Sequence, residues 1–332
     1  MVKTINQQRN RASVKVLMAD SDSYIRQAFS NALSTEGYRD IRTLSRLSVL
    51  RDVLIAAVPD LVILDSEMPD GDAIRLVREV RNGQLGRNPF VPIILTVWDS
   101  DGISIDEAVN SGVDLILAKP LAPAQLFSRI DALVAERKPF VVTADYIGPD
   151  RRERISPNDE NSFEVPNTLR DKVSGTPIDE AALNAHIETT LKEINSSRLQ
   201  QGSLQLACQV EVLIRAFSAG KVGKSTRQHL GRIITSTEDI VMRVQNTEFE
   251  QLKGLCESLI NVARDVYRRP KKADPKQVDL MRPLSQSILV STNPDLKSQL
   301  PAEEIENMVS NYAARVRSRI PSAGSDDNAA SA

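Results

Sequence analysis

The first part of the chain alternates short apolar runs with amphipathic stretches of helical length. A strand that helices cover on both faces reads as a continuous apolar run, so the runs predict strands of a parallel sheet. Most of the stretches between them are bounded by glycine or proline, as helices are. The pattern therefore predicts an α/β fold, a doubly wound five-stranded parallel sheet with helices packed on its faces. The expected strands are residues 14–19, 41–44, 61–64, 91–97 and 113–118, and the expected helices are residues 24–35, 47–57, 71–81, 103–111 and 123–137.

The pattern changes after this first domain, which we place at residues 13–138. Residues 139–177 mix glycine, proline and charged residues and indicate a linker. Residues 178–269 have apolar residues at helical spacing and predict a helical bundle. One helix is expected to begin near Thr247, because Thr247 and Glu250 have capping-box spacing. The clearest apolar stripe consists of Leu252, Leu255, Leu259, Val262 and Val266.

The two ends of the chain and residues 270–320 complete the expected organisation. Residues 1–12 and 321–332 are polar or low in complexity and predict disordered tails. Residues 270–320 predict a basic turn followed by C-terminal helices, the last beginning at Pro301.

Composition narrows the classes of partner. The 42 lysines and arginines nearly balance the 44 aspartates and glutamates, so no strong overall field would hold the chain on nucleic acid or on a membrane. The two cysteines, Cys208 and Cys256, lie far apart without metal-ligand spacing, which disfavours a disulfide framework or a zinc site. No apolar stretch approaches the length of a membrane helix. We expect a soluble cytoplasmic protein with no nucleic-acid or membrane partner.

Four polar residues stand at the ends of predicted strands. Asp20, Asp65, Thr96 and Lys119 follow or end the first, third, fourth and fifth apolar runs. Ligands of a doubly wound sheet bind where the carboxyl ends of its strands meet, so these side chains should converge. Two carboxylates suit a hard cation such as Mg²⁺, and a hydroxyl with an ammonium suits phosphate oxygens. Together they are the groups that phosphoryl transfer to an aspartate requires.

These residues, together with residues 61–65, Met68-Pro69, Gly71 and Lys119-Pro120, resemble the signature of a known domain. It is the chemotaxis-type receiver domain of bacterial two-component response regulators, which has a flavodoxin-like fold. The resemblance covers a little over a third of the chain and leaves the mainly α-helical C-terminal domain unrecognised.

The resemblance implies a role for each matched residue. It makes Asp65 the phosphoacceptor, and it makes Asp20, Asp65 and the backbone carbonyl of Glu67 the ligands of Mg²⁺. It makes Thr96 the switch hydroxyl and Lys119 the ammonium that pairs with the phosphoryl group, followed by a cis peptide bond to Pro120.

At the level of the whole protein, the resemblance implies a response regulator of phosphorelay signal transduction. A histidine kinase or a phosphotransfer protein would donate the phosphoryl group. Phosphorylation would switch contacts of the receiver and the helical domain with a downstream protein, and a homodimer is a further partner that the family allows. The chain would be no enzyme beyond its own phosphotransfer and dephosphorylation.

Three departures from the receiver pattern support an alternative function. Ser21 stands where a second acidic residue is usual, with Asp22 one position later, Ile116 replaces the usual aromatic residue, and Val97 replaces a smaller one. Losing one negative ligand should weaken Mg²⁺ binding unless Asp22 substitutes. The alternative is a receiver-shaped scaffold that binds its partners without phosphorylation.

Three other segments have competing interpretations. Gly223-Lys224-Ser225 resembles the end of a phosphate-binding loop, with residues 204–214 as its strand, which would make the helical domain nucleotide-binding. A basic loop between two helices is favoured, because Ser218 occupies the usual first glycine position. Arg151 and Arg152 could contact a phosphate, although a solvated linker is favoured. Trp98 could report on the site or mediate docking, and a packing role is at least as good an interpretation.

Overall fold

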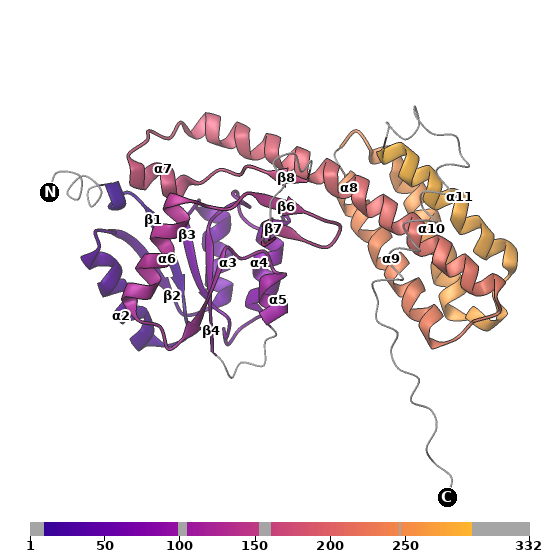
Figure 1. The fold of residues 1–332 in the computed structure, drawn as a ribbon, viewed down its shortest axis with the longest axis horizontal. Helices are drawn as coiled ribbons and strands as arrows, with labels where there is room; N and C mark the ends of the chain where they lie inside the picture. The colour runs from indigo at the N-terminus through magenta and orange to yellow at the C-terminus, as the bar shows by residue number, and fades with distance from the viewer. Residues whose placement is uncertain (1–9, 99–104, 153–160, 246, 294–332) are drawn as a thin grey trace, which may run out of the picture. The chain divides into compact units, whose positions relative to one another are not determined.

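The computed structural model describes residues 10–98, 105–152, 161–245 and 247–293. The chain divides between Ile194 and Asn195 into two compact units (Figure 1). We call them the first unit (residues 1–194) and the second unit (residues 195–332) and describe each by itself. None of the described helices has the length and apolar character needed to cross a membrane.

The first unit contains the predicted five-stranded sheet. All four strand pairs are parallel, and the strand order is β2-β1-β3-β4-β5. This is the flavodoxin-like receiver topology, so the fold expected from the sequence is confirmed. The strands are β1 (Lys15–Ala19), β2 (Asp40–Leu44), β3 (Leu61–Asp65), β4 (Ile93–Trp98) and β5 (Leu115–Lys119). The helices are α2 (Ser23–Thr35), α3 (Leu47–Ala56), α4 (Ala73–Arg81), α5 (Ile105–Val109) and α6 (Pro123–Ala135).

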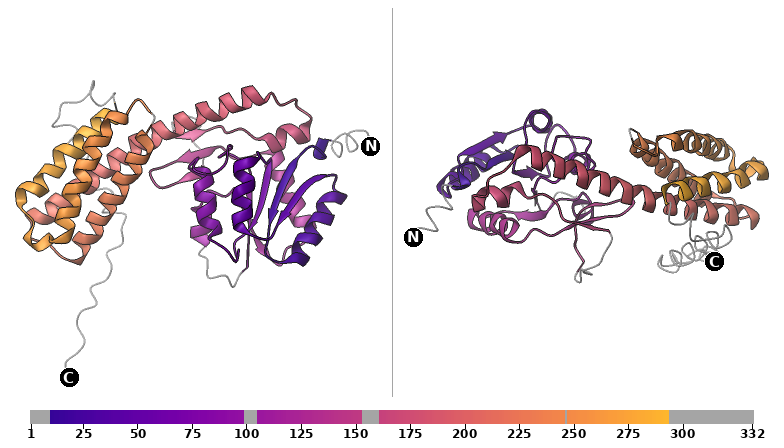
Figure 2. Two further views of the ribbon diagram at one scale, coloured as in Figure 1. Left: turned by 180° about the vertical axis from the view of Figure 1, so that it is seen from behind. Right: turned by 90° about the horizontal axis from the view of Figure 1, so that it is seen from above.

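Two separate cores cover the two faces of the sheet, as the helix layers in Figures 1 and 2 show. Along β3, Val62 and Leu64 point toward the core formed with α3 and α4, and Leu61 and Ile63 point toward the core formed with α2 and α6. Successive residues of a strand face opposite sides, so a strand buried on both sides must be apolar throughout. This is why the apolar runs located the strands.

The described parts of residues 139–177, which are residues 139–152 and 161–177, are folded, which corrects the expectation of a linker there. They contain β6 (Phe140–Val142), β7 (Ile147–Pro149) and β8 (Ser162–Phe163), which form an antiparallel sheet in the order β7-β6-β8, and the helix α7 (Thr168–Ser174). Phe140, Val142 and Ile147 share a buried cluster with Phe90, and α7 packs against one core of the main sheet. Apolar residues too few to form a periodic pattern are nevertheless enough to dock this segment.

A close backbone approach explains one of the glycines that suggested a linker. The Cα atom of Gly112 would lie 2.7 Å from a Cβ added at Gly148. A Cβ on Gly112, which has a φ of +92°, would lie 2.2 Å from the carbonyl oxygen of Ile147. Both glycines therefore let β7 pack against the turn before β5.

A buried ionic cluster fastens the same region. Arg81 Nη2 donates to Asp114 Oδ2 at 2.8 Å, and Arg137 Nε donates to Asp114 Oδ1 at 2.7 Å. Arg81 also donates to the carbonyl of Gly112 at 2.7 Å, and both guanidinium groups lie over the Phe140 ring, at 5.2 and 5.0 Å from its centroid. Because the charges are paired and hydrogen-bonded, they can be buried. They join α4, the start of β5 and β6.

Arg151 and Arg152 adjoin the folded part of this segment and hydrogen-bond to it, although both residues remain exposed, as the solvated interpretation expected. Arg151 Nη2 donates to the carbonyl of Val113 at 2.6 Å, and Arg152 Nε donates to the fully buried Asp150 at 2.9 Å. The end of the tail expected at residues 1–12 is also packed, since Arg11 forms ion pairs with Glu36 and Asp131. Residues 1–9 lie outside the described residues.

The described part of the second unit is helical, as predicted. Its helices are α8 (Glu180–Ser218), which begins in the first unit, α9 (Lys224–Val244), α10 (Lys253–Arg268) and α11 (Pro275–Thr292), with the short 3-10 turns η1 (Glu250–Leu252) and η2 (Pro270–Lys272). Leu252, Leu259 and Val266 of the predicted stripe are buried, and Leu255 and Val262 pack against the same core. The helix expected at Pro301 and the tail at residues 321–332 lie outside the described residues.

Two local expectations for the second unit are corrected. The helix expected to begin near Thr247 begins at Lys253, after η1. The Thr247 hydroxyl donates to the Val244 carbonyl at 2.7 Å and accepts from the N–H of Phe249 at 3.2 Å, so it stabilises the turn between α9 and η1. Residues 204–214 lie within α8, so the strand that a phosphate-binding loop requires is not formed there. Gly223 instead precedes α9, at the end of a loop between two helices. Cys208 and Cys256 are free and buried, and burial raises the pKa of each thiol to about 12.

Candidate functional site

The candidate site lies where the carboxyl ends of β1, β3, β4 and β5 meet. Asp65 ends β3 and pairs in register with Thr96 of β4, while Asp20 follows β1 directly and Lys119 ends β5. The strands are parallel and adjacent in the order β1-β3-β4-β5, so their ends share one edge of the sheet. The peptide bond from Lys119 to Pro120 is cis, as expected.

Lys119 joins the two carboxylates of the site. Its Nζ atom lies 2.8 Å from Asp20 Oδ2 and 2.8 Å from Asp65 Oδ1. Asp20, Asp65 and Lys119 are only 2%, 3% and 6% exposed. Among the described residues, Asp65 Oδ1 accepts no well-directed hydrogen bond, so its contact with Lys119 is an ion pair. One buried ammonium therefore bridges two buried carboxylates on neighbouring loops.

Burial and the neighbouring charges together set the pKa values of Asp65 and Lys119. Burial raises the pKa of Asp65, and the nearby Asp20 adds to that rise, while Lys119 and the backbone N–H of Glu67 only partly oppose it. Burial alone would lower the pKa of Lys119, but its contacts with Asp20 and Asp65 more than offset that effect, so its pKa is raised. Lys119 therefore remains a cation at neutral pH, and the negative charge on Asp65 is held at a cost.

The loop after β1 fixes Asp20. Arg26 donates to the backbone carbonyls of Asp20 and Ser21 at 2.7 and 2.9 Å, and the backbone N–H of Asp22 donates to Asp20 Oδ1 at 2.8 Å. The Asp22 carboxylate caps α2 by accepting from the N–H of Tyr24 at 2.7 Å. Asp22 therefore serves the helix and does not replace the acidic residue missing at Ser21.

Thr96 is buried within the same edge. Its hydroxyl donates to the carbonyl of Leu64 at 3.4 Å, a long hydrogen bond that a better acceptor could replace. Ile116 is partly buried against the core that α3 and α4 form, so an aliphatic side chain occupies the position where an aromatic residue is usual. Val97 packs against that core as well.

The oxygen atoms of the site suit Mg²⁺. The donor set consists of two carboxylates at one edge of the sheet, and water can supply the remaining ligands that an octahedral ion needs. Within the described ranges, no group of three or more His, Cys, Asp or Glu side chains could hold a metal. A further protein ligand would come from another kind of oxygen atom, and the Glu67 backbone carbonyl is the one expected to provide it.

Trp98 borders the site and was only partly anticipated. It pairs in register with Lys119, and its ring centroid lies 5.6 Å from Lys119 Nζ. Its side chain remains 39% exposed. The position of Trp98 two residues beyond Thr96, directly after the same predicted strand, was the available signal. As the only tryptophan in the chain, it can report on the site by fluorescence.

Comparison with known proteins identifies part of the first unit. A family model described as the response regulator receiver domain matches residues 16–131. Residues 16–131 are a response regulator receiver domain. The match leaves the helical region unassigned.

Relatives and solved structures match the same portion of the chain. The transcriptional regulatory protein GltR of Pseudomonas aeruginosa is 34% identical over 119 residues, which are 36% of this chain and 48% of that protein. The KDP operon transcriptional regulatory protein KdpE of Escherichia coli is 33% identical over 131 residues, which are 39% of this chain and 54% of that protein. The chain thus spans about half the length of these relatives. The chemotaxis response regulator CheY4 of Vibrio cholerae is 26% identical, with a TM-score of 0.31, covering 36% of this chain and 98% of its own.

Proposed function

We propose that this chain is a response regulator of phosphorelay signalling that accepts a phosphoryl group on Asp65. The observation that carries the proposal is the buried ammonium of Lys119, 2.8 Å from both Asp20 and Asp65. A carboxylate nucleophile beside a fixed cation, at the ligand-binding edge of a receiver domain, is the arrangement that this transfer needs.

Each side chain has a distinct part in the proposed transfer. An Asp65 oxygen attacks the phosphorus of the donor, and the bond from phosphorus to the leaving group breaks. Lys119 keeps its charge and pairs with an oxygen of the arriving phosphoryl group. The Thr96 hydroxyl gives up its long bond to Leu64 and donates to another phosphoryl oxygen. Mg²⁺, held by Asp20, Asp65 and the Glu67 carbonyl, would neutralise charge on the phosphoryl oxygens.

The proposed partners follow from the same chemistry. A histidine kinase or a phosphotransfer protein would supply the phosphoryl group. Phosphorylation would alter contacts of the receiver domain and the helical unit with a downstream protein, or between two copies of the chain. The local change from which such a switch would start is the move of the Thr96 hydroxyl from the Leu64 carbonyl to a phosphoryl oxygen.

The scaffold alternative retains specific support. Asp22 is engaged as the cap of α2, so the site has two acidic side chains where Ser21 removes the third. With Ile116 in place of an aromatic residue, threonine movement has no ring to displace. A receiver domain that binds partners without phosphorylation would need neither feature.

Labelling with a radioactive acyl phosphate distinguishes the two functions. The proposal predicts Mg²⁺-dependent labelling of the full chain, loss of the label in Asp65→Asn and retention in Asp70→Asn. Asp70 is a suitable control because it belongs to the same loop but accepts hydrogen bonds from the start of α3 instead. An unlabelled chain, alongside a labelled control receiver, would leave the scaffold as the better account.

A further inference from the structure

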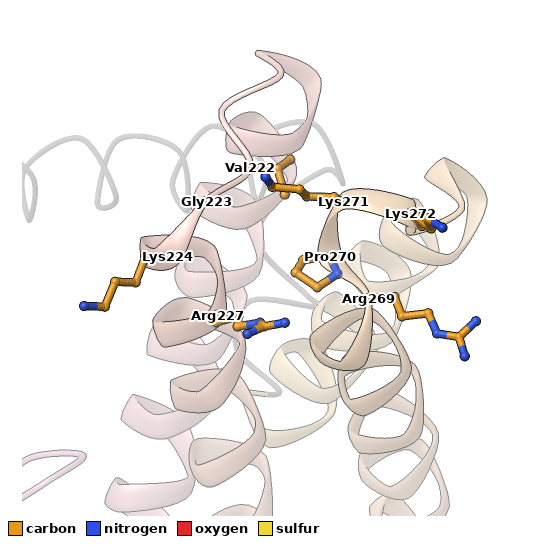
Figure 3. A pocket seen from close by; sticks show the side chains of 8 residues that line it. All are labelled: Val222, Gly223, Lys224, Arg227, Arg269, Pro270, Lys271 and Lys272. Atoms are coloured by element: carbon orange, nitrogen blue, oxygen red, sulfur yellow. The ribbon is translucent and has the colours of Figure 1, made fainter.

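Two basic turns meet at one end of the second unit. The loop between α8 and α9 and the 3-10 turn η2 between α10 and α11 line a cavity of about 690 Å³ that is open to solvent (Figure 3). Among the described residues that line it, none is acidic and five are basic: Lys224, Arg227, Arg269, Lys271 and Lys272. The cavity is independent of the phosphorylation site and belongs wholly to the second unit.

The basic residues of this cavity lack anionic partners. Within the part of the chain that the structure describes, none of the five forms an ion pair or donates a side-chain hydrogen bond. Six arginines elsewhere in the same unit do have acidic partners: Arg198, Arg215, Arg243, Arg264, Arg268 and Arg282. Of the nine described lysines and arginines of this unit without such a partner, five line the cavity, and the other four are Lys221, Arg232, Lys253 and Lys276.

The sequence reinforces this concentration of charge. Residues 212–237 and residues 266–273 contain no aspartate or glutamate, although the whole chain carries a net charge of only −2. Like charges held close together repel each other, so a bound anion would relieve repulsion as well as form new contacts.

The side chains are arranged as an inner pair and a rim. Figure 3 shows Arg227 extending from α9 toward η2, and Lys271 extending from η2 toward Val222. Lys224, Arg269 and Lys272 point outward on either side. Pro270 is buried and Val222 is partly buried, so part of the cavity wall is apolar. An anion would approach over a cationic rim and be held between cations from both turns.

We propose that this cavity binds a small organic ligand that carries a di- or triphosphate group. Cations on two opposed turns require more than one negative charge, and each phosphate supplies one to two. The forked guanidinium of Arg227 matches phosphate oxygens in pairs. The volume suits a small molecule, and Val222 and Pro270 can contact its organic part. Side chains on two helical turns would hold the phosphates, in contrast to the glycine-rich loop and strand of a phosphate-binding loop.

Calorimetry on the full chain tests this site, with pyrophosphate and ATP as probes. EDTA is present throughout, so that Mg²⁺ does not recruit either probe to the receiver domain. We expect saturable binding of both, with ATP at least as tight as pyrophosphate. Arg227→Gln/Lys271→Gln should weaken binding by at least about tenfold, because two charge-assisted contacts are lost.

A matched control separates the cavity from general surface charge. Arg232→Gln/Lys253→Gln removes one arginine and one lysine, both exposed in the same unit but outside the cavity lining, and should change affinity by less than about twofold. The rim variant Lys224→Gln/Lys272→Gln should weaken binding less than the inner variant does. Matching circular dichroism spectra establish that all variants are folded.

Three results would overturn the proposal. The first is the absence of saturable binding by the wild-type chain. The second is an equal loss of affinity in the inner variant and the matched control, which would mean diffuse attraction. The third is binding of a single-stranded oligonucleotide without binding of pyrophosphate or ATP, which would make this end of the unit a nucleic-acid surface.

Discussion

Replacing Lys119 by methionine tests the cation that joins the two carboxylates of the receiver site. Methionine has a similar length and fits apolar surroundings, but it leaves Asp20 and Asp65 facing each other without an ammonium. Both carboxylates are at most 3% exposed, so water cannot readily take the place of the lost charge. The perturbation is therefore chiefly electrostatic.

The size of the effect follows from burial. Removing one partner of a buried ion pair costs about 3–5 kcal/mol of unfolding free energy. In a unit of this size that loss lowers the melting temperature by on the order of 10 °C. The pKa of Asp65 is already raised in the folded chain, and losing Lys119 raises it further. The deficit should therefore be present at neutral pH and shrink as the pH falls through the raised pKa of Asp65, since protonation removes the uncompensated charge.

Denaturation followed by Trp98 fluorescence measures this effect in the first unit. In EDTA, Lys119→Met should be destabilised as stated, and Mg²⁺ should stabilise it more than it stabilises the wild-type chain, because the ion supplies the missing charge. Lys119→Met/Asp65→Asn should recover most of the loss, because one of the two facing charges is gone. A loss below about 1 kcal/mol that Asp65→Asn does not change would refute the electrostatic account.

Three further predictions concern the first unit. Asp114→Asn should lower its unfolding free energy by about 3–5 kcal/mol in urea denaturation, because the buried guanidinium of Arg81 loses its anion; an unchanged midpoint would contradict this. The hydrogen bond from the Ser48 hydroxyl is the main cause that lowers the pKa of Asp70 from 3.8 to about 2. The ionised Asp70 carboxylate therefore stabilises the fold fully above pH 3.8, and this stabilisation is lost as the pH falls through about 2. Thermal melts of Asp70→Asn should therefore differ from wild type at pH 5 and converge with it near pH 2. Gly112→Ala should speed hydrogen exchange at residues 140–149, because its Cβ would collide with the carbonyl of Ile147.

The sheet and the site could be predicted because their sequence signals are local. Strands buried on both faces must be apolar, and the polar residues that end them lie at one edge whatever the details of packing. The segment after residue 138 gave no such signal. Its strands have two or three residues each, and its glycines indicate close packing against the receiver as much as a flexible linker.

Long-range partners explain the other differences. Arg81 ends an amphipathic helix, where a cation usually faces solvent, and only the fold brings Asp114 to it. The helix α8 borders one apolar cluster through Ile187 and Ile194 and others further along, so no single stripe marks its length of 39 residues. The basic cavity likewise combines turns that lie more than 40 residues apart in the sequence.

The most direct test of the proposed function locates the modified residue chemically. The chain is incubated with Mg²⁺ and an acyl phosphate, any aspartyl phosphate is reduced with borohydride to homoserine, and peptide mass spectrometry finds the converted position. We predict conversion at Asp65, dependent on Mg²⁺ and greatly reduced in Lys119→Met. Conversion at Asp20 or Asp70 instead, or at no aspartate while a control receiver reacts, would contradict the assignment of Asp65 as the phosphoacceptor.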